Sequence, residues 1–288
     1  MSETIHPTRN EVAALLRNPR FELMPFDSFP DELQHLPDGA TVTVTASPTK
    51  GLESTIDRSV EAAEDGYEVV PHVAARYVRD DSHASEIAER FHDAGISDVF
   101  VPGGDREEPI GEFESAYELL STWDELGYEF DDIGITGYPE GHEFLDEETL
   151  AESMDRKLPY ATYVTTQMCY DPETIVDWIE TLRDRGIELP VQVGIPGVVN
   201  YQRLLRISSR VGVGDSIRFL QKTSGVLDFL RKLVGSRGTY EPDDLVEGLA
   251  RYSADPEYGI EGIHIYTFNQ TADTESWRRE MLRRWQSG

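Results

Sequence analysis

The chain has 288 residues and a formal net charge of −29, from 55 acidic and 26 basic residues. Such a surface repels nucleic acid and anionic membranes, because phosphate binding needs clustered cations. No run of about 18 apolar residues occurs, and no basic region precedes an apolar stretch at the N-terminus, so we expect a soluble protein of the cytoplasm. The single cysteine, Cys169, excludes an internal disulfide and a cysteine-cluster metal site.

The kind of charge indicates a source. The acidic residues are spread along the whole chain, so they do not form an acidic tail for a basic partner. Lysine occurs only as Lys50, Lys157, Lys222 and Lys232. A surface rich in acids and poor in lysine is typical of a protein kept soluble in very high salt, where self-repulsion is screened. We therefore expect a halophilic source.

One pattern repeats along the chain: an amphipathic helix, a glycine, and then an apolar run rich in β-branched residues. The glycines that end these helices are Gly66, Gly95, Gly127 and Gly186. Glycine just past a helix supplies the left-handed backbone that ends it, and continuous apolar runs are typical of buried parallel strands. The pattern therefore predicts alternating helices and parallel strands.

The expected elements follow one another in a regular order. A helix is expected at 8–18, before the first strand. Eight strands are expected near 20–25, 40–46, 67–75, 98–104, 133–139, 161–169, 190–197 and 262–268. Asp146, Asp171 and Asn200 are the expected caps of three of the helices. The long interval 200–260, between the seventh and eighth strands, must contain extra helices.

Eight strand–helix units without a change in composition predict an α/β fold, the (β/α)8 TIM barrel, as a single domain over residues 1–288. The alternative is an open, doubly wound sheet. The absence of G-x-G-x-x-G after the first strand weakens that alternative.

Reacting groups of such a barrel lie at the carboxyl ends of its strands. Glu22 is the most informative of the polar residues there, because it stands inside the apolar run Phe21–Phe26. Burial of an acid raises its pKa toward the range of a useful general acid. The alternative is a glutamate on the outward face, paired with an arginine of a helix.

Other polar residues are less specific when taken one at a time. His72 alone suits a core histidine, Gly103-Gly104-Asp105 a turn, and Tyr266 the filling of the barrel. A metal site formed by His72, Asp105, His142 and His264 is a competing use of these strand ends. No H-x-H or H-E-x-x-H pair supports it, so no metal is expected.

Together, the strand ends resemble a known family. Phe21-Glu22-Leu23-Met24-Pro25 resembles the Phe-Glu-Phe-Phe-Pro opening of methylenetetrahydrofolate reductases. Further short motifs follow in the family's order: Val42–Thr45, Pro71-His72, Gly104-Asp105, Tyr138–His142, Thr166–Asp171, Ile195–Gly197 and His264–Asn269. Each motif is weak alone, but all stand at strand ends, and the match runs from about residue 20 to 270.

The resemblance implies a flavoenzyme of one-carbon metabolism. NAD(P)H would reduce FAD and leave, and 5,10-methylenetetrahydrofolate would then take a hydride from the flavin in a ping-pong reaction. Glu22 matches the general acid that helps open the folate ring, and Asp105 matches the acid beside the flavin and the pterin. Gln167 and Tyr266 match folate-binding positions. The FAD-lining positions are matched by Thr45, His72, Gly104, Asp105, Tyr138, His142, Arg156 and Lys157, the last two near its phosphates.

The chain departs from the family's pattern in three places. Gly103 stands where the family usually has arginine, Gln270 stands where it commonly has an arginine that meets the folate glutamate, and Ala46–Lys50 lacks the usual Tyr-Gly. These departures bear on flavin affinity and on the preferred folate tail.

Other functions therefore stay open. One alternative is a barrel that has lost FAD and binds a pterin or folate, and another is a metal-dependent hydrolase. The expected partner is a small folate, with no nucleic acid and no membrane. Members of the family often assemble through barrel surfaces, so a homo-oligomer also stays open.

Overall fold

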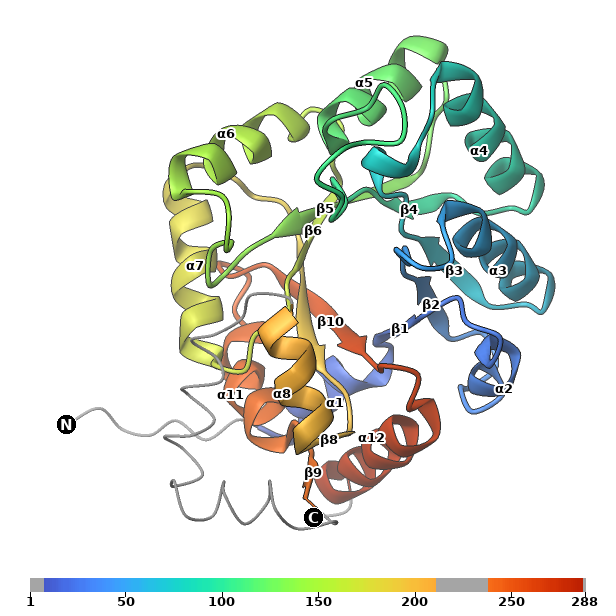
Figure 1. Ribbon diagram of the computed structural model, residues 1–288. Coiled ribbons are helices and arrows are strands. Elements are labelled where there is room, and N and C mark those ends of the chain that lie inside the picture. Colours follow the sequence, from blue (N-terminus) through green and yellow to red (C-terminus); the bar gives the residue numbers. More distant parts are fainter. Residues whose placement is uncertain (1–7, 211–237, 287–288) are drawn as a thin grey trace. The chain divides into compact units, whose positions relative to one another are not determined.

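The computed structural model describes residues 8–210 and 238–286, drawn in colour in Figure 1. Its contacts divide the chain into two compact units. The N-terminal unit contains Arg20–Thr136 and Glu147–Thr165. The C-terminal unit contains Met1–Pro19, Gly137–Asp146 and Thr166–Gly288. The expectation of a single domain over residues 1–288 stays a prediction.

The N-terminal unit carries the first six strands and the helices that follow the first five of them. Its elements are β1 (Arg20–Leu23), α2 (Phe29–Leu33), β2 (Thr41–Val44), α3 (Leu52–Glu64), β3 (Glu68–Pro71), the 3-10 turn η1 (Ala75–Tyr77), α4 (Asp81–Asp93), β4 (Asp98–Phe100), α5 (Ala116–Leu126), α6 (Glu147–Lys157), and, up to their last residues, β5 (Asp132–Gly137) and β6 (Tyr163–Thr166). β1 pairs with β2, β2 with β3 and β4 with β5, all in parallel, and a bridge between His72 and Phe100 joins β3 to β4.

The C-terminal unit carries the remaining strands and the helices around them. Its elements are α1 (Arg9–Arg17), α7 (Pro172–Asp184), β7 (Val191–Pro196), β8 (Val199–Asn200), α8 (Tyr201–Arg210), β9 (Thr239–Tyr240), α11 (Asp243–Ser253), β10 (Ile260–Tyr266) and α12 (Thr271–Gln286). β10 pairs with β7 in parallel, and β8 pairs with β9 in antiparallel orientation. α1 packs against α11 and α12, where Arg278 donates a hydrogen bond to the carbonyl oxygen of Leu16.

The order of these elements is that of a (β/α)8 barrel with an N-terminal helix, as the sequence predicts. All four predicted helix-ending glycines have a left-handed backbone, with φ between 72° at Gly95 and 89° at Gly66. Of the extra helices expected at 200–260, α8 and α11 are described, and residues 211–237 lie outside the described part.

Several strands are shorter than predicted, and for two of them the difference matters for the site. Strands were expected at 67–75 and 98–104, but β3 ends at Pro71 and β4 ends at Phe100. Proline has no N–H for a sheet hydrogen bond, and Pro71 and Pro102 stand where regular pairing stops. The freed segment after β3 forms the turn Ala75–Tyr77, which brings Tyr77 to Asp105.

Within residues 8–210 and 238–286, none of the helices has both the length and the apolar composition needed to span a membrane.

Candidate functional site

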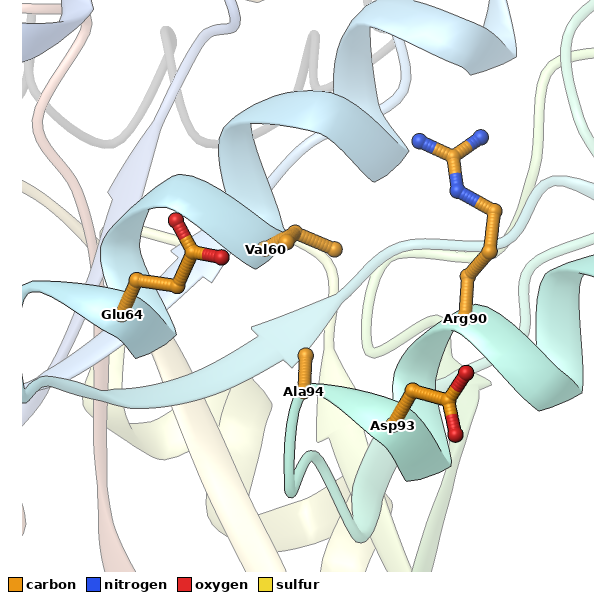
Figure 2. A pocket seen from close by; sticks show the side chains of 5 residues that line it. All are labelled: Val60, Glu64, Arg90, Asp93 and Ala94. Carbon is orange, nitrogen blue, oxygen red and sulfur yellow. The ribbon is translucent and has the colours of Figure 1, made fainter.

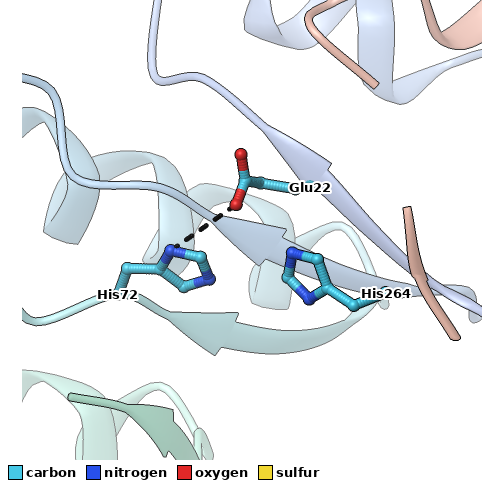
Figure 3. A group of neighbouring side chains, drawn as sticks. All are labelled: Glu22, His72 and His264. Atoms are coloured by element: carbon cyan, nitrogen blue, oxygen red, sulfur yellow. Dashed lines mark ion pairs between the residues drawn. The ribbon is translucent and has the colours of Figure 1, made fainter. Parts of the chain in front are cut away.

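The central residue of the N-terminal unit is Glu22. It lies in register with Thr43 of β2, which lies in register with Val70 of β3. Side chains in register on parallel strands point to the same face, so all three share one face of the sheet. The carboxylate of Glu22 is 13% exposed and lies 3.8 Å from Nδ1 of His72 (Figure 3).

This environment changes the protonation of Glu22. Burial raises the pKa of its carboxyl to about 7, and the imidazole of His72 opposes that rise. His72 is itself buried, with its ring centroid 4.7 Å from that of Phe100. At neutral pH the carboxyl is therefore divided between its acid and its carboxylate forms, as a group that donates and recovers a proton needs to be.

Two threonines, Thr43 of β2 and Thr45 just after its end, belong to the strand that pairs with β1. Thr43 is fully buried, and its hydroxyl has no hydrogen-bond partner among the described residues. Because buried polar groups are nearly always hydrogen-bonded, this hydroxyl fits a ligand or a water molecule. The Thr45 hydroxyl lies 3.4 Å from the carbonyl oxygen of Ala46, and its amide is bonded to Leu23. Thr45 is thus held by its main chain.

The turn after β4 holds an acid in a fixed position. Gly104 has φ of +100°, and a Cβ there would lie 3.3 Å from that of Ala74, so glycine suits this turn. The hydroxyl of Tyr77 donates a 2.9 Å hydrogen bond to Oδ1 of Asp105. Arg106 lies over the ring of Tyr77, at 5.5 Å from its centroid. Tyr77 was not among the site residues predicted from the sequence, because it follows the predicted third strand (67–75) and no motif includes it.

Arg76 ties this turn to the segment that follows. Its guanidinium donates to the carbonyl oxygens of Arg106, Glu107 and Glu114, at 2.6, 3.1 and 2.8 Å. These hydrogen bonds make Arg76 a structural residue of the loop. Arg106 is the more exposed of the two arginines beside Asp105. It therefore supplies a cation close to Gly103, the position where the family usually has one.

The end of α6 carries a buried cation. Lys157 is 5% exposed, and no ion pair or hydrogen bond of its ammonium group is formed with any described residue. Burial alone lowers its pKa to about 8. Arg156 is exposed and lies 4.0 Å from the ring centroid of Tyr117. A buried ammonium without a protein anion fits an anionic ligand such as a phosphate.

In the C-terminal unit, Gln167 and Tyr266 are both placed by backbone contacts. The hydroxyl of Tyr266 donates to the carbonyl oxygen of Thr166 at 3.0 Å, and its ring lies 4.8 Å from that of His264. The side-chain oxygen of Gln167 accepts from the amide of Met168 at 2.8 Å. This leaves the amide nitrogen of Gln167 as its donor toward a ligand.

Three aromatic residues follow one another after β5. The ring of His142 lies 5.2 Å from that of Tyr138 and 6.0 Å from that of Phe144. Nδ1 of His142 accepts from the amide of Phe144 at 3.2 Å, and Phe144 is 80% exposed. The ring plane of His142 is inclined by 86° to that of Tyr138 and by 64° to that of Phe144, so the three rings form an edge-to-face aromatic cluster with Phe144 at its exposed end.

The four residues of the alternative metal site, His72, Asp105, His142 and His264, are not all brought together. The structure brings His72 beside Glu22, an acid that the sequence did not include in the metal set. Neither Asp105 nor His142 belongs to a group of three or more possible metal ligands among the described residues.

One surface hollow lies away from these strand ends. It has a volume of about 240 Å³ and lies between the last turns of α3 and α4 (Figure 2). Its lining residues are Val60, Glu64, Arg90, Asp93 and Ala94. α3 and α4 are followed by β3 and β4, so the hollow lies beside the beginnings of these two strands, whereas Asp105 follows the end of β4.

A family model described as methylenetetrahydrofolate reductase matches residues 26–277, which is most of the chain. The chain belongs to the methylenetetrahydrofolate reductase family. Membership of this family supports the (β/α)8 barrel fold. The matched range includes every site position named above except Glu22. Since the match begins at residue 26, the role of Glu22 rests on the motif at 21–25 and on its geometry.

Named relatives support the same family. The chain is 28% identical over 193 residues to methylenetetrahydrofolate reductase 1 of Schizosaccharomyces pombe, covering 63% of this chain and 30% of that protein. It is 31% identical over 147 residues to methylenetetrahydrofolate reductase 2 of Saccharomyces cerevisiae, covering 48% of this chain and 22% of that protein. It is 26% identical over 214 residues to 5,10-methylenetetrahydrofolate reductase of Pectobacterium carotovorum, covering 71% of this chain and 66% of that protein. The chain thus matches less than a third of the two yeast proteins and about two thirds of the bacterial one.

Proposed function

We propose that this protein reduces 5,10-methylenetetrahydrofolate to 5-methyltetrahydrofolate, with NAD(P)H as electron donor, FAD as cofactor and Glu22 as general acid. The observation that carries the proposal is Glu22, a buried acid with its pKa raised to about 7, on a strand face that continues toward His72. A carboxyl with an ordinary pKa would be almost fully ionised at neutral pH and unable to donate a proton.

The residues present fit a dinucleotide cofactor. Lys157 is a buried cation without an anion among the described residues, which suits a phosphate group, and exposed Arg156 precedes it on α6. The turn at Gly104 and the carboxylate of Asp105, fixed by Tyr77, suit the edge of a polar ring system. When bound, the flavin supplies the hydride.

Glu22 supplies the proton. In its acid form, the carboxyl donates to the substrate nitrogen whose bond to the methylene carbon breaks as the folate ring opens. His72, at 3.8 Å, can stabilise the carboxylate that remains. Because the pKa of Glu22 lies near 7, the folate step should slow as pH rises above about 7 and the acid form is lost.

Asp105 stays in place through the Tyr77 hydroxyl. The hydrogen bond from Tyr77 fixes the position of the Asp105 carboxyl group beside any ring bound at this turn. Gln167 and Tyr266 serve the folate in this proposal, with the free amide nitrogen of Gln167 as a hydrogen-bond donor and the ring of Tyr266 as a packing surface.

A second candidate function has its own observation. Gly103 stands in place of a cation, so a barrel that binds a pterin without FAD is the alternative. Arg106, which lies beside Asp105, argues against that alternative by supplying a nearby guanidinium. We further propose a cytoplasmic protein from a halophilic source, consistent with the net charge of −29.

The test is an anaerobic titration of FAD-loaded protein, first with NADH or NADPH and then with methylenetetrahydrofolate. The flavin absorbance should bleach with the nicotinamide and recover with the folate. Failure of the protein to bind FAD would favour the pterin-binding alternative, and a stoichiometric divalent metal in the purified protein would favour a hydrolase.

The substitution Glu22→Gln tests the acid. It should slow the folate step by about 100- to 10,000-fold and leave the nicotinamide step close to that of the unchanged protein. Glu68→Gln is the matched control, because Glu68 is an exposed acid on β3, which is separated from β1 by β2. Equal loss of both steps in Glu22→Gln would reject the assignment of Glu22 as general acid.

A further inference from the structure

The C-terminal unit contains a guanidinium held at the end of β10. Arg203, on α8, is half-buried and donates a 2.6 Å hydrogen bond from Nη2 to the carbonyl oxygen of Phe268. In the amide orientation that satisfies both of its polar ends, Gln270 accepts from Nη1 of Arg203 at 2.8 Å and donates to Val198 at 3.2 Å. Arg203 is thus fixed at the turn that directly follows Tyr266.

That turn has an unusual backbone. Phe268 and Asn269 are the non-glycine residues with positive φ in the described part of the chain, at 53° and 52°. A left-handed conformation costs a non-glycine residue about 1–2 kcal/mol, and such strain is concentrated at functional sites. Hydrogen bonds from the amides of Asn269 and Gln270 to Thr267 hold the turn, together with that of Arg203.

α8 is also fixed independently of Arg203. Tyr201 and Leu204 are buried, and the ring of Tyr201 lies 6.0 Å from that of Tyr240 on β9. The hydroxyls of Ser208 and Tyr170 lie 2.6 Å apart. Side chains packed by their neighbours hold a binding group more precisely than mobile ones. The position of Arg203 is therefore set by the helix as well as by the turn.

The electrostatics of Arg203 is the remaining observation. Its hydrogen-bond acceptors are neutral oxygens, and none of the carboxylates in the described residues forms an ion pair with it. This is notable in a chain where acids outnumber bases by 55 to 26. A guanidinium that keeps its positive charge without a protein acid is suited to an external carboxylate.

We propose that Arg203 binds the carboxylates of the glutamate tail of the folate, and that Gln270 positions its guanidinium. This rests on the proposed function, because it requires a folate at Tyr266. Gln270 stands where the family commonly has arginine. In this chain the guanidinium comes from Arg203 on α8, and the neutral amide of Gln270 stands in the turn. The positive charge is therefore kept beside the turn but is supplied by another residue.

The experiment compares two ligands that differ only in the tail. One is 5-methyltetrahydrofolate, and the other is an analogue that ends in a plain amide instead of glutamate. Dissociation constants are measured by calorimetry at one fixed ionic strength, because salt screens charge interactions. The unchanged protein should bind the glutamate form about 10- to 100-fold more tightly, the range expected for a charge-assisted hydrogen bond.

Three variants locate that preference. Arg203→Gln should remove it, and the double change Arg203→Gln with Gln270→Arg should restore most of it by returning a guanidinium to the turn. Arg206→Gln is the matched control, with the same loss of charge at an exposed position one turn along α8. Arg203→Lys keeps the positive charge but changes the packing, so it should keep a part of the preference. If Arg203→Lys loses as much of the preference as Arg203→Gln does, the packing of Arg203 rather than its charge explains the loss.

The outcomes separate the two proposals. If the unchanged protein binds both ligands equally, Arg203 is not the tail-binding residue. The same conclusion follows if Arg203→Gln prefers the glutamate form as strongly as Arg206→Gln does. In both cases the reductase proposal stands. If the protein binds neither ligand, the proposed folate function fails and this inference fails with it.

Discussion

Two charged residues of β1, only two positions apart, lie on the same face of the strand in very different surroundings. Arg20 lies 3.1 Å from a carboxylate oxygen of Asp98 and 4.3 Å from the ring centroid of Tyr163. Tyr163 also donates a 2.8 Å hydrogen bond to Asp98. Glu22, by contrast, faces an imidazole at 3.8 Å.

The acids of the two regions differ accordingly. Burial raises the pKa of Asp98 to about 6, and the guanidinium of Arg20 and the hydroxyl of Tyr163 limit that rise. Burial raises the pKa of Glu22 to about 7. Asp98 is therefore held by a guanidinium and a hydroxyl, whereas Glu22 has an imidazole nearby and a pKa raised to about 7. These partners indicate that the Arg20 region is structural and that the Glu22 region can exchange protons.

The largest expected effect is a loss of stability when the ion pair between Arg20 and Asp98 is removed. Arg20→Met should lower the free energy of unfolding by about 3–5 kcal/mol, because it leaves Asp98 buried without its cation. Chemical denaturation measures this loss. Arg79→Met is the control, since Arg79 is 53% exposed and lies 3.9 Å from Glu86, and should change stability by less than about 1 kcal/mol.

A double change tests the cause of that loss. Arg20→Met combined with Asp98→Leu should recover much of the stability, because no charge is then left unpaired. If the double variant is no more stable than Arg20→Met alone, the loss comes from packing around Tyr163 and the contrast with Glu22 is weakened.

The next effect concerns Glu22 and pH. Its pKa is raised from 4.5 to about 7, so its ionisation costs the folded state on the order of 3 kcal/mol. The stability associated with its acid form is complete below about pH 4.5 and is lost as pH rises through about 7. Glu22→Gln should therefore be more stable than the unchanged protein at pH 8, with little difference at pH 4.5.

Thermal unfolding at several pH values measures that difference. Glu68→Gln should show no such trend, because Glu68 is exposed. A constant difference between Glu22→Gln and the unchanged protein across this pH range would mean that Glu22 has an ordinary pKa.

The smallest expected effect concerns Lys157, a buried cation that, unlike Arg20, forms no ion pair with a described residue. Lys157→Met should weaken FAD binding by about 10- to 100-fold if the ammonium meets a phosphate. It should leave the affinity for riboflavin, which has no phosphate, unchanged. The exposed Lys50, which pairs with Asp27 at 2.8 Å, provides the control Lys50→Met. Equal weakening of both flavins would contradict phosphate binding by Lys157.

Much of the fold could be predicted from the sequence, because local signals are strong. Continuous apolar runs, and glycines such as Gly66 and Gly127 that end the preceding helices, place all eight parallel strands. These glycines have the left-handed backbone that was predicted. The ends of β3 and β4 were placed too late, because Val73–Ala75 looks as apolar as a strand. Only the three-dimensional path shows that it turns toward Asp105.

The site was less readable, because its contacts join distant parts of the sequence. Glu22 was conspicuous as an acid among apolar residues, and it lies on the buried face as expected. Arg203 looked like an ordinary residue of a long helical interval, since its partners Phe268 and Gln270 are more than sixty positions away. Arg20 and Asp98 stand at strand beginnings, where polar residues are common.

Gly194 of β7 limits how this protein can be redesigned. A Cβ at that position would lie 2.3 Å from the carbonyl oxygen of Thr166 and 2.8 Å from Cε2 of Tyr266. Even alanine would push the tyrosine ring away from the strand or shift the main chain of β6. In the proposed reductase, admitting a bulkier pterin would therefore require a change of residue 266 itself, because the main chain of Gly194 lies against its ring and cannot be shortened.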